Sequence, residues 1–219
     1  MIGQRGLVHI IDDDSRIRQA MMMLLESAGI AGRAYGSAEE FLARPESEHP
    51  DFIILALRLP GMNGLQLLQQ LRTEMIDTPV IIVSAYADVP STVRAMKLGA
   101  VDLLEKPVDA TVMRETIERS LALGQSLRRK RDDAEQVRRR FERLTARELE
   151  LLQFIVEGHL SKQIAVEMGI SVKTVANHRA NLMTKTGASN AADLARLFTT
   201  YKSSAPPSGD SAPPRQPPG

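Results

Sequence analysis

Polar residues that follow apolar stretches in the first half of the chain could bind a metal ion and a phosphoryl group. Asp12 and Asp13 come directly after one short apolar stretch, Ser84 ends another, and Lys106 follows a third. Adjacent carboxylates are ligands that Mg²⁺ prefers, while a serine hydroxyl and an ammonium group can both donate to phosphoryl oxygens. A further apolar stretch leads to Ala56, whose methyl group offers no oxygen. These residue types predict a metal and phosphate pocket to which residue 56 contributes no ligand.

An alternation of strands and helices must position these residues. The apolar stretches are short, and the segments between them have helical apolar spacing with capping and glycine stop signals. Strands are expected at residues 7–11, 31–35, 52–57, 79–83 and 101–105, and helices at residues 16–27, 65–75, 91–98, 110–123 and after Ser37. This spacing predicts an α/β fold with a parallel five-stranded sheet in the flavodoxin-like, doubly wound order. Ligands of such sheets bind at the carboxyl ends of the strands, where the polar residues above would meet.

Composition and charge limit the class of protein. The chain has 219 residues, of which 43% are hydrophobic, enough for one or two globular domains. It has no cysteine, which excludes disulfides and thiolate metal sites. No apolar run approaches the roughly 20 residues that span a membrane, so we expect a cytoplasmic protein without a membrane partner. Residues 1–124 contain 12 Lys/Arg against 17 Asp/Glu, whereas residues 125–219 contain 16 against 10, which suggests a nucleic acid as partner of the second half.

The second half of the chain has a different pattern. A highly charged segment with few apolar positions is predicted to be an exposed or dimerising linker helix, too polar for a core. Beyond it, Thr145 and Glu148 form a predicted capping box. A helix, a turn at Gly169 and a helix capped by Ser171 are typical of a helix-turn-helix domain. The predicted organisation is a first domain at 6–123, a linker helix at 124–143, a small all-α domain at 144–202 and a disordered tail at 203–219.

Residues 6–123 resemble the receiver domains of NarL/FixJ-type two-component response regulators. Asp12 and Asp13 match the acidic pair of that family, Ser84 matches the switch hydroxyl, and Lys106, followed by proline, matches the motif lysine. The resemblance implies a Mg²⁺ site formed by the two aspartates and the backbone carbonyl of Arg58.

The chain departs from the receiver pattern at two positions. Ala56 stands where the family has the aspartate that accepts the phosphoryl group, so an acyl phosphate cannot form there and Mg²⁺ binding should weaken. Leu103 stands where many receivers have an aromatic switch residue. Because the pocket is otherwise complete, we interpret Ala56 as an engineered replacement of aspartate that disables phosphorylation.

Residues 144–200 resemble LuxR-type helix-turn-helix domains, with matching motifs at 144–148, 157–158, 162–165, 169–175 and 178–181. The helix that Ser171 caps is then the recognition helix, which lies in the major groove. Val175 and Leu182 have the spacing of buried residues, and the last helix, at 190–201, is implied as a dimer contact on DNA. The residues expected to contact phosphates are Lys173, Thr174, Arg179 and Lys185. The residues expected to face base edges are Ala176, Asn177 and Ala180, with His178 and Asn181 as secondary candidates.

Together these features predict a DNA-binding transcriptional response regulator, not an enzyme, whose phospho-switch is disabled. The implied partners are a sensor histidine kinase, double-stranded promoter DNA and a second copy of the chain, with RNA polymerase as a further candidate. Two alternatives stay open. One is a natural regulator that works without phosphorylation. The other is a phosphatase of the haloacid-dehalogenase type that uses Asp12 and Asp14 as its nucleophile and acid/base pair.

Overall fold

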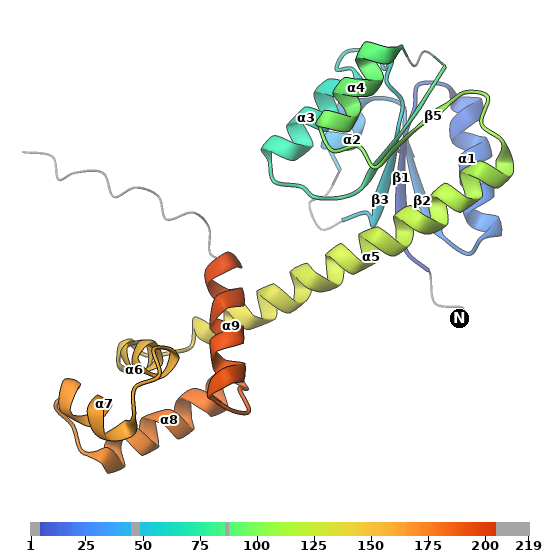
Figure 1. Cartoon of the computed structure of the whole chain (residues 1–219). Helices are drawn as coiled ribbons and strands as arrows, with labels where there is room; N and C mark the ends of the chain where they lie inside the picture. The colour runs from blue at the N-terminus through green and yellow to red at the C-terminus, as the bar shows by residue number, and fades with distance from the viewer. Residues whose placement is uncertain (1–4, 45–48, 86–87, 205–219) are drawn as a thin grey trace, which may run out of the picture. The chain divides into compact units, whose positions relative to one another are not determined.

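A computed structural model describes residues 5–44, 49–85 and 88–204 of the chain (Figure 1). The chain divides into two compact units between Arg129 and Lys130. The elements that begin in the first unit are β1 (Leu7–Ile11), α1 (Ser15–Ser27), β2 (Ala31–Tyr35), α2 (Ala38–Leu42), β3 (Phe52–Leu55), α3 (Gly64–Thr73), β4 (Val80–Ser84), α4 (Val89–Lys97), β5 (Asp102–Glu105) and α5 (Ala110–Phe141). The second unit also contains α6 (Ala146–Val156), α7 (Ser161–Glu167), α8 (Val172–Thr186) and α9 (Ala191–Ser204). The tail was predicted to begin at residue 203, but α9 extends to Ser204; from residue 205 onward, the predicted tail lies outside the described residues.

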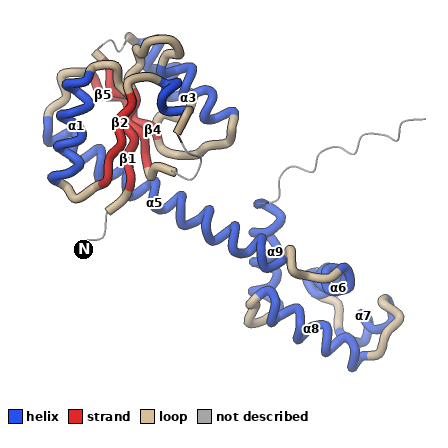
Figure 2. Tube along the Cα trace, turned by 180° about the vertical axis from the view of Figure 1, so that it is seen from behind, coloured by secondary structure: helices blue, strands red, loops and turns tan. Residues whose placement is uncertain are grey.

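The first unit is a five-stranded sheet in the order β2-β1-β3-β4-β5, and every neighbouring pair of strands is parallel. Figure 2 shows the strands in red between flanking helices. This order confirms the predicted flavodoxin-like fold. The strand order reverses direction between β1 and β3, which is where such sheets place their ligands.

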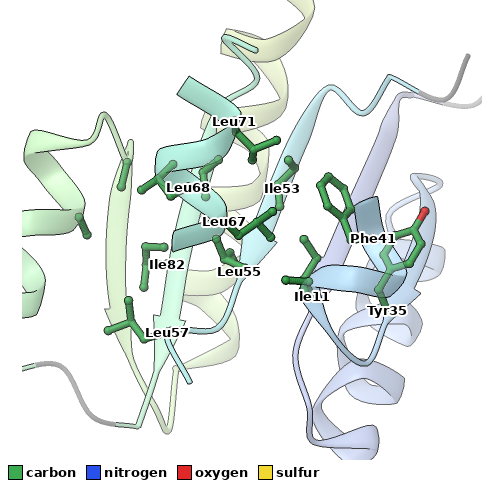
Figure 3. Packing of buried hydrophobic residues seen from close by; sticks show 14 residues of the cluster. Ile11, Tyr35, Phe41, Ile53, Leu55, Leu57, Leu67, Leu68, Leu71 and Ile82 are labelled. Atoms are coloured by element: carbon green, nitrogen blue, oxygen red, sulfur yellow. The ribbon is translucent and has the colours of Figure 1, made fainter. Parts of the chain in front are cut away.

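Side chains of the strands alternate between the two faces of the sheet, as strand geometry requires. Ile11 and Leu55 lie on the face covered by α2, α3 and α4, where they pack with Phe41 and the leucines of α3 (Figure 3). Neighbouring residues such as Ile10 point to the other face and pack against α1 and α5, for example at Ile117. Both faces are therefore buried, which is why the strands read as continuous apolar runs in the sequence.

Helix α5 differs from its prediction. It runs unbroken from Ala110 to Phe141, where two helices were expected. The interpretation that its charged part takes no part in a core is wrong at its end, because Val137 and Phe141 are only 8% and 1% exposed in the core of the second unit. Two apolar residues one turn apart suffice to bury a helix face, even where most other residues of the segment are charged or polar. In the described part of the chain no helix, α5 included, is both long and apolar enough to cross a membrane.

The helices of the second unit begin at the predicted caps. The hydroxyl of Thr145 accepts from the backbone N–H of Glu148 (3.3 Å), and the Glu148 carboxylate accepts from the backbone N–H of Thr145 (2.8 Å), which confirms the capping box. Ser171 accepts from the N–H of Thr174 (3.1 Å) at the start of α8. Since caps satisfy N–H groups that have no partner inside the helix, they fix where α6 and α8 begin.

Strand β1 carries a histidine, His9, that is fully buried inside the first unit. Its ring lies against Tyr35 and Phe41, with centroid distances of 5.2 and 5.8 Å. Neither ring nitrogen has a hydrogen-bond partner among the described residues. Burial, reinforced by the positive charges of Arg44 and Arg33, lowers the pKa of His9 from 6.5 to about 4. His9 is therefore neutral in the folded protein at neutral pH.

We expect the first unit to lose stability as the pH falls from 6.5 towards 4. In this range the unfolded chain binds a proton at His9 and the folded chain does not, so acid favours unfolding; above this range neither state binds one. A pKa shift of this size corresponds to about 3 kcal/mol of unfolding free energy across the window. Denaturant unfolding at a series of pH values should show a smaller pH dependence for His9→Leu. His49→Leu, which alters an exposed histidine of the same unit, is the matched control, and equal pH dependence in all three chains would contradict the prediction.

Candidate functional site

The carboxyl ends of β1, β3, β4 and β5 bring four of the predicted site residues to one edge of the sheet. The backbone N–H of Ala56 donates to the carbonyl of Ile11 (2.9 Å), which places residue 56 beside the end of β1 and the following Asp12. The backbone N–H of Lys106 likewise donates to the carbonyl of Ser84 (2.9 Å). Asp12, Ala56 and Ser84 are each at most 4% exposed. The parallel register therefore assembles this set from segments far apart in the chain.

Lys106 and Asp12 form a nearly buried ion pair at this edge. The ammonium of Lys106 donates to Oδ2 of Asp12 at 2.5 Å, and the two side chains are 18% and 5% exposed. The other oxygen, Oδ1, accepts from the backbone N–H of Asp14 (3.0 Å), and the guanidinium of Arg18 donates to the carbonyl of Asp12 (2.7 Å). A buried carboxylate is costly unless its charge is compensated and hydrogen-bonded. These contacts supply that compensation and hold the Lys106 ammonium on Asp12.

The loop after β3 holds residue 56 in place. The first residue of α3, Gly64, lies so close to Ala56 that a Cβ at Gly64 would be 2.1 Å from the carbonyl oxygen of Ala56. The N–H of Gly64 donates to the carbonyl of Leu57 (2.9 Å). Further along the loop, the carboxylate of Glu39 accepts from the N–H of Met62 (2.8 Å). The close contact at Gly64 and these hydrogen bonds therefore fix the backbone around residue 56.

The remaining predicted residues of this edge have different surroundings. Asp13 and Arg58 are exposed, whereas Leu103 is half-buried and packs against the core on the α3 face of the sheet. The pKa of Asp88 lies below its ordinary value, chiefly because its carboxylate accepts hydrogen bonds from Ser91 and in smaller part because of the charge of Arg58. Leu103 thus belongs to the packing of β5, and Asp13 and Arg58 face solvent.

The residues at this edge fit a Mg²⁺ ion poorly. Mg²⁺ requires near-octahedral coordination by oxygen atoms. The available donors are Asp12, which is paired with Lys106, the exposed Asp13 and the backbone carbonyl of Arg58, while Ala56 contributes a methyl group. Among the described residues, no three acidic or histidine side chains lie close enough together to hold a metal ion.

In the second unit, α7, a turn and α8 form a helix-turn-helix. Gly169 has φ +65°, a left-handed conformation that favours glycine, at the turn. Val175 and Leu182 are fully buried, as their spacing predicts, and they fix which face of α8 points outward. The predicted DNA contacts that are exposed are Lys173, Ala176, Asn177, Ala180 and Asn181. Those that are half-buried are Thr174, His178 and Arg179. Because residues three and four apart share a helix face, the exposed set forms one continuous strip.

Lys185 does not have the surroundings expected of a phosphate contact. Its ammonium donates to Oε2 of Glu148 (2.7 Å), whose side chain is 4% exposed. Burial acts to raise the pKa of Glu148, but hydrogen bonds from Lys185 and Thr145 outweigh it, so the pKa lies below its ordinary value. The phosphate contact of Lys185 stays a prediction, and in this structure its ammonium is paired with Glu148 inside the unit. The capping box identifies Glu148 in the sequence, but no local signal links it to a residue 37 positions later.

Two family models match the chain. The model described as "Response regulator receiver domain" matches residues 8–118. The model described as "Bacterial regulatory proteins, luxR family" matches residues 142–198. The first match covers the sheet edge described above, and the second covers the helix-turn-helix.

Known proteins are similar to this chain over most of its length. The chain is 38% identical to the transcriptional regulatory protein FixJ of Azorhizobium caulinodans over 190 residues, which are 87% of this chain and 90% of that protein. It is 33% identical to the response regulator protein TodT of Pseudomonas putida F1, over 93% of this chain and 90% of that protein. A solved structure of the response regulator StyR is similar with a TM-score of 0.79 and 37% identity, over 89% of this chain and 98% of that one.

Proposed function

This chain belongs to the two-component response regulators, transcription regulators that join a receiver domain to a LuxR-type DNA-binding domain, and we propose that its phospho-switch is disabled at Ala56. The observation that supports this is Ala56, a residue only 4% exposed, at the sheet edge that also holds Asp12, Ser84 and Lys106. A methyl carbon has no lone pair with which to attack a phosphoryl donor, so no acyl phosphate can form there. We interpret the alanine as an engineered replacement of aspartate. A natural regulator that works without phosphorylation would differ by binding its operator tightly without a phosphodonor.

The surroundings of Asp14 favour regulation over phosphatase catalysis. Asp14 is the N-cap of α1. Its carboxylate accepts a hydrogen bond from the backbone N–H of Arg16 (2.9 Å) and forms an ion pair with the guanidinium of Arg16 (3.2 Å). A dehalogenase-type mechanism would need Asp12 as a free nucleophile, but Asp12 is paired with Lys106. Both carboxylates of that hypothesis therefore have structural partners.

Receiver domains generally bind Mg²⁺ at their phosphorylation site. We propose that binding is weakened in this chain, because the methyl of Ala56 removes one anionic ligand. The groups left to hold the ion are the carboxylates of Asp12 and Asp13 and the carbonyl of Arg58. Any Mg²⁺ that binds must also compete with Lys106 for Asp12.

The partners follow from the two domains. A receiver joined to a DNA-binding domain implies a cognate kinase and DNA. We assign residues 6–123 to the receiver, 144–202 to the DNA-binding domain and 124–143 to the linker helix. We propose that two copies of the chain pair on DNA through the outer face of α9, since Leu194 and Leu197 already pack inside the unit. RNA polymerase is a further candidate partner.

The exposed strip of α8, together with the half-buried residues Thr174, His178 and Arg179, supports the proposed DNA contacts. Lys173 and Arg179 suit phosphates and would position the domain without reading sequence. Asn177 is suited to hydrogen-bond an adenine edge, and the alanines beside it, Ala176 and Ala180, to touch thymine methyl groups. The half-buried Thr174 suits a phosphate, and His178 and Asn181 are secondary base contacts.

Selection of binding duplexes from a randomised DNA library tests this assignment. We expect Lys173→Met to weaken binding to all selected sequences and to lower the slope of log K against log salt by about 0.9. We expect Asn177→Ala to cost about 1–3 kcal/mol at the base pair it reads and to relax the preference there.

Lys97→Met, the same change at an exposed position of the receiver, is the control and should leave DNA binding unchanged. Failure of both the unaltered chain and Ala56→Asp phosphorylated by acetyl phosphate to enrich any sequence would contradict the proposed function. A loss of sequence preference with Lys173→Met rather than Asn177→Ala would contradict the assignment of the two roles.

A further inference from the structure

The last turn of α8 is held by two other helices of the second unit. Lys185 pairs with Glu148 in the first turn of α6. The carbonyl of Thr186 accepts from the guanidinium of Arg140, in the last turn of α5, at a longer 3.5 Å. Immediately after α8, Gly187 adopts φ +73°, and a Cβ there would lie 3.2 Å from the Arg140 guanidinium. The carboxyl end of α8 is therefore the point where α5, α6 and α8 meet.

Glu148 is the centre of this arrangement. Its Oε2 accepts from the backbone N–H of Thr145 (2.8 Å), from the Thr145 hydroxyl (3.0 Å) and from the Lys185 ammonium (2.7 Å). The residue is 3% exposed, so these groups replace the water that would otherwise solvate the carboxylate. The contact is short and charge-assisted, which restricts its geometry more than a surface ion pair would. The same carboxylate thus caps α6 and anchors α8.

We propose that Glu148 and Lys185 are positioning residues for DNA recognition by α8, an inference that rests on the proposed function. Lys185 lies roughly 18 Å along the helix axis from Lys173, at the other end of α8. Because α8 is one continuous helix, a change of tilt at its anchored end displaces the exposed strip that faces the base edges. Base readout depends on hydrogen-bond geometry and is sensitive to such displacements.

A direct phosphate contact by Lys185 would have a different signature. If the ammonium left Glu148 for a phosphate, it would leave a buried carboxylate without its counter-ion, which is unfavourable. While the pair is intact its charges cancel, so it adds little to the attraction between the unit and DNA. A positioning role therefore predicts weaker binding with an unchanged salt dependence when either partner is altered.

The test is a double-mutant cycle with Lys185→Met and Glu148→Gln, measured as the dissociation constant for a selected duplex at several salt concentrations. Glutamine keeps the shape of Glu148 and an oxygen that can cap Thr145. We expect each single variant to bind about tenfold more weakly and the double variant no more weakly than either, since the pair acts as one unit. The salt slope should stay that of the unaltered chain, whereas Lys173→Met should lower it by about 0.9. Lys185→Arg should retain most of the affinity.

Amide exchange of the free protein provides a second readout. Exchange in the last turn of α8 should rise about tenfold in Lys185→Met, while α6 beyond its first turn keeps its protection. A lowered salt slope in Lys185→Met with normal binding by Glu148→Gln would overturn the inference in favour of a phosphate contact. Unchanged affinity in both variants would also overturn it. If neither the unaltered chain nor phosphorylated Ala56→Asp binds a duplex, the proposed function fails, and the exchange data still decide whether the pair anchors α8. If Glu148→Gln does not fold, Lys185→Met and Lys185→Arg carry the test.

Discussion

Replacing Ala56 by aspartate is expected to turn a chain that takes up no phosphoryl group at residue 56 into one that is phosphorylated there. The surrounding groups are already in place, with Asp12, Ser84 and Lys106 at the same sheet edge. A carboxylate oxygen at residue 56 would attack the phosphorus of acetyl phosphate, forming a new O–P bond as the bond to the acetate oxygen breaks. The added carboxylate would also supply a third anionic oxygen ligand for Mg²⁺. The intact mass of each chain after incubation with acetyl phosphate and Mg²⁺ measures the result.

Ala56→Asn is the matched control, because it has nearly the size of aspartate and no carboxylate. We expect it to stay unlabelled, like the unaltered chain. We also expect phosphorylated Ala56→Asp to dimerise more strongly and to bind its duplex more tightly than the other two chains. Labelling of the unaltered chain, for instance on Asp13, would contradict the expectation that its pocket takes up no phosphoryl group. Equally tight dimerisation and DNA binding by the unaltered chain and Ala56→Asp without a donor would favour the phosphorylation-independent alternative.

Phe141→Ala is expected to destabilise the second unit by about 3–5 kcal/mol, the usual cost of truncating a buried aromatic side chain. Phe141 is 1% exposed, and its ring stacks on Tyr201 and Phe198 with centroid distances of 5.0 and 6.1 Å. A loss of this size is a large part of the stability of a small domain. Hydrogen exchange resolved by segment should therefore show faster exchange throughout α6 to α9, by about two orders of magnitude or more, with the strands β1 to β5 unaffected.

The matched control for this prediction is Gln136→Ala, an exposed position on the same helix, which should change stability by no more than about 0.5 kcal/mol. Phe141→Ala should also abolish DNA binding under conditions where the second unit unfolds. If exchange in α6 to α9 is the same in both variants, the end of α5 is a spacer rather than part of the DNA-binding unit.

Features with local sequence signals were predictable. The parallel sheet follows from short apolar runs alternating with helical segments, and the topology rules for such sheets then bring the strand ends together. The capping box of Thr145 with Glu148 and the cap at Ser171 involve residues three positions apart, so they are visible in the sequence. The buried face of α8 follows from the spacing of Val175 and Leu182.

Roles that depend on distant partners were not predictable. Sequence patterns did not indicate that Glu39 would hold the loop at Met62, because the two residues are 23 positions apart and neither has a local signal. The core role of Phe141 was hidden, since the charged residues around it dominate the local composition.

The amino-acid sequence by itself determined the two-domain organisation, the sheet edge, the helix-turn-helix and the absence of a carboxylate at residue 56. Periodicity, caps and side-chain chemistry are properties of neighbouring residues, so they can be read without coordinates. Only the tertiary structure decided that Lys106 pairs with Asp12, 94 positions away, and that Lys185 pairs with Glu148. A charged side chain pairs with an opposite charge that folding brings close to it. The more deeply the pair is buried, the greater the free-energy cost of leaving either charge without its partner.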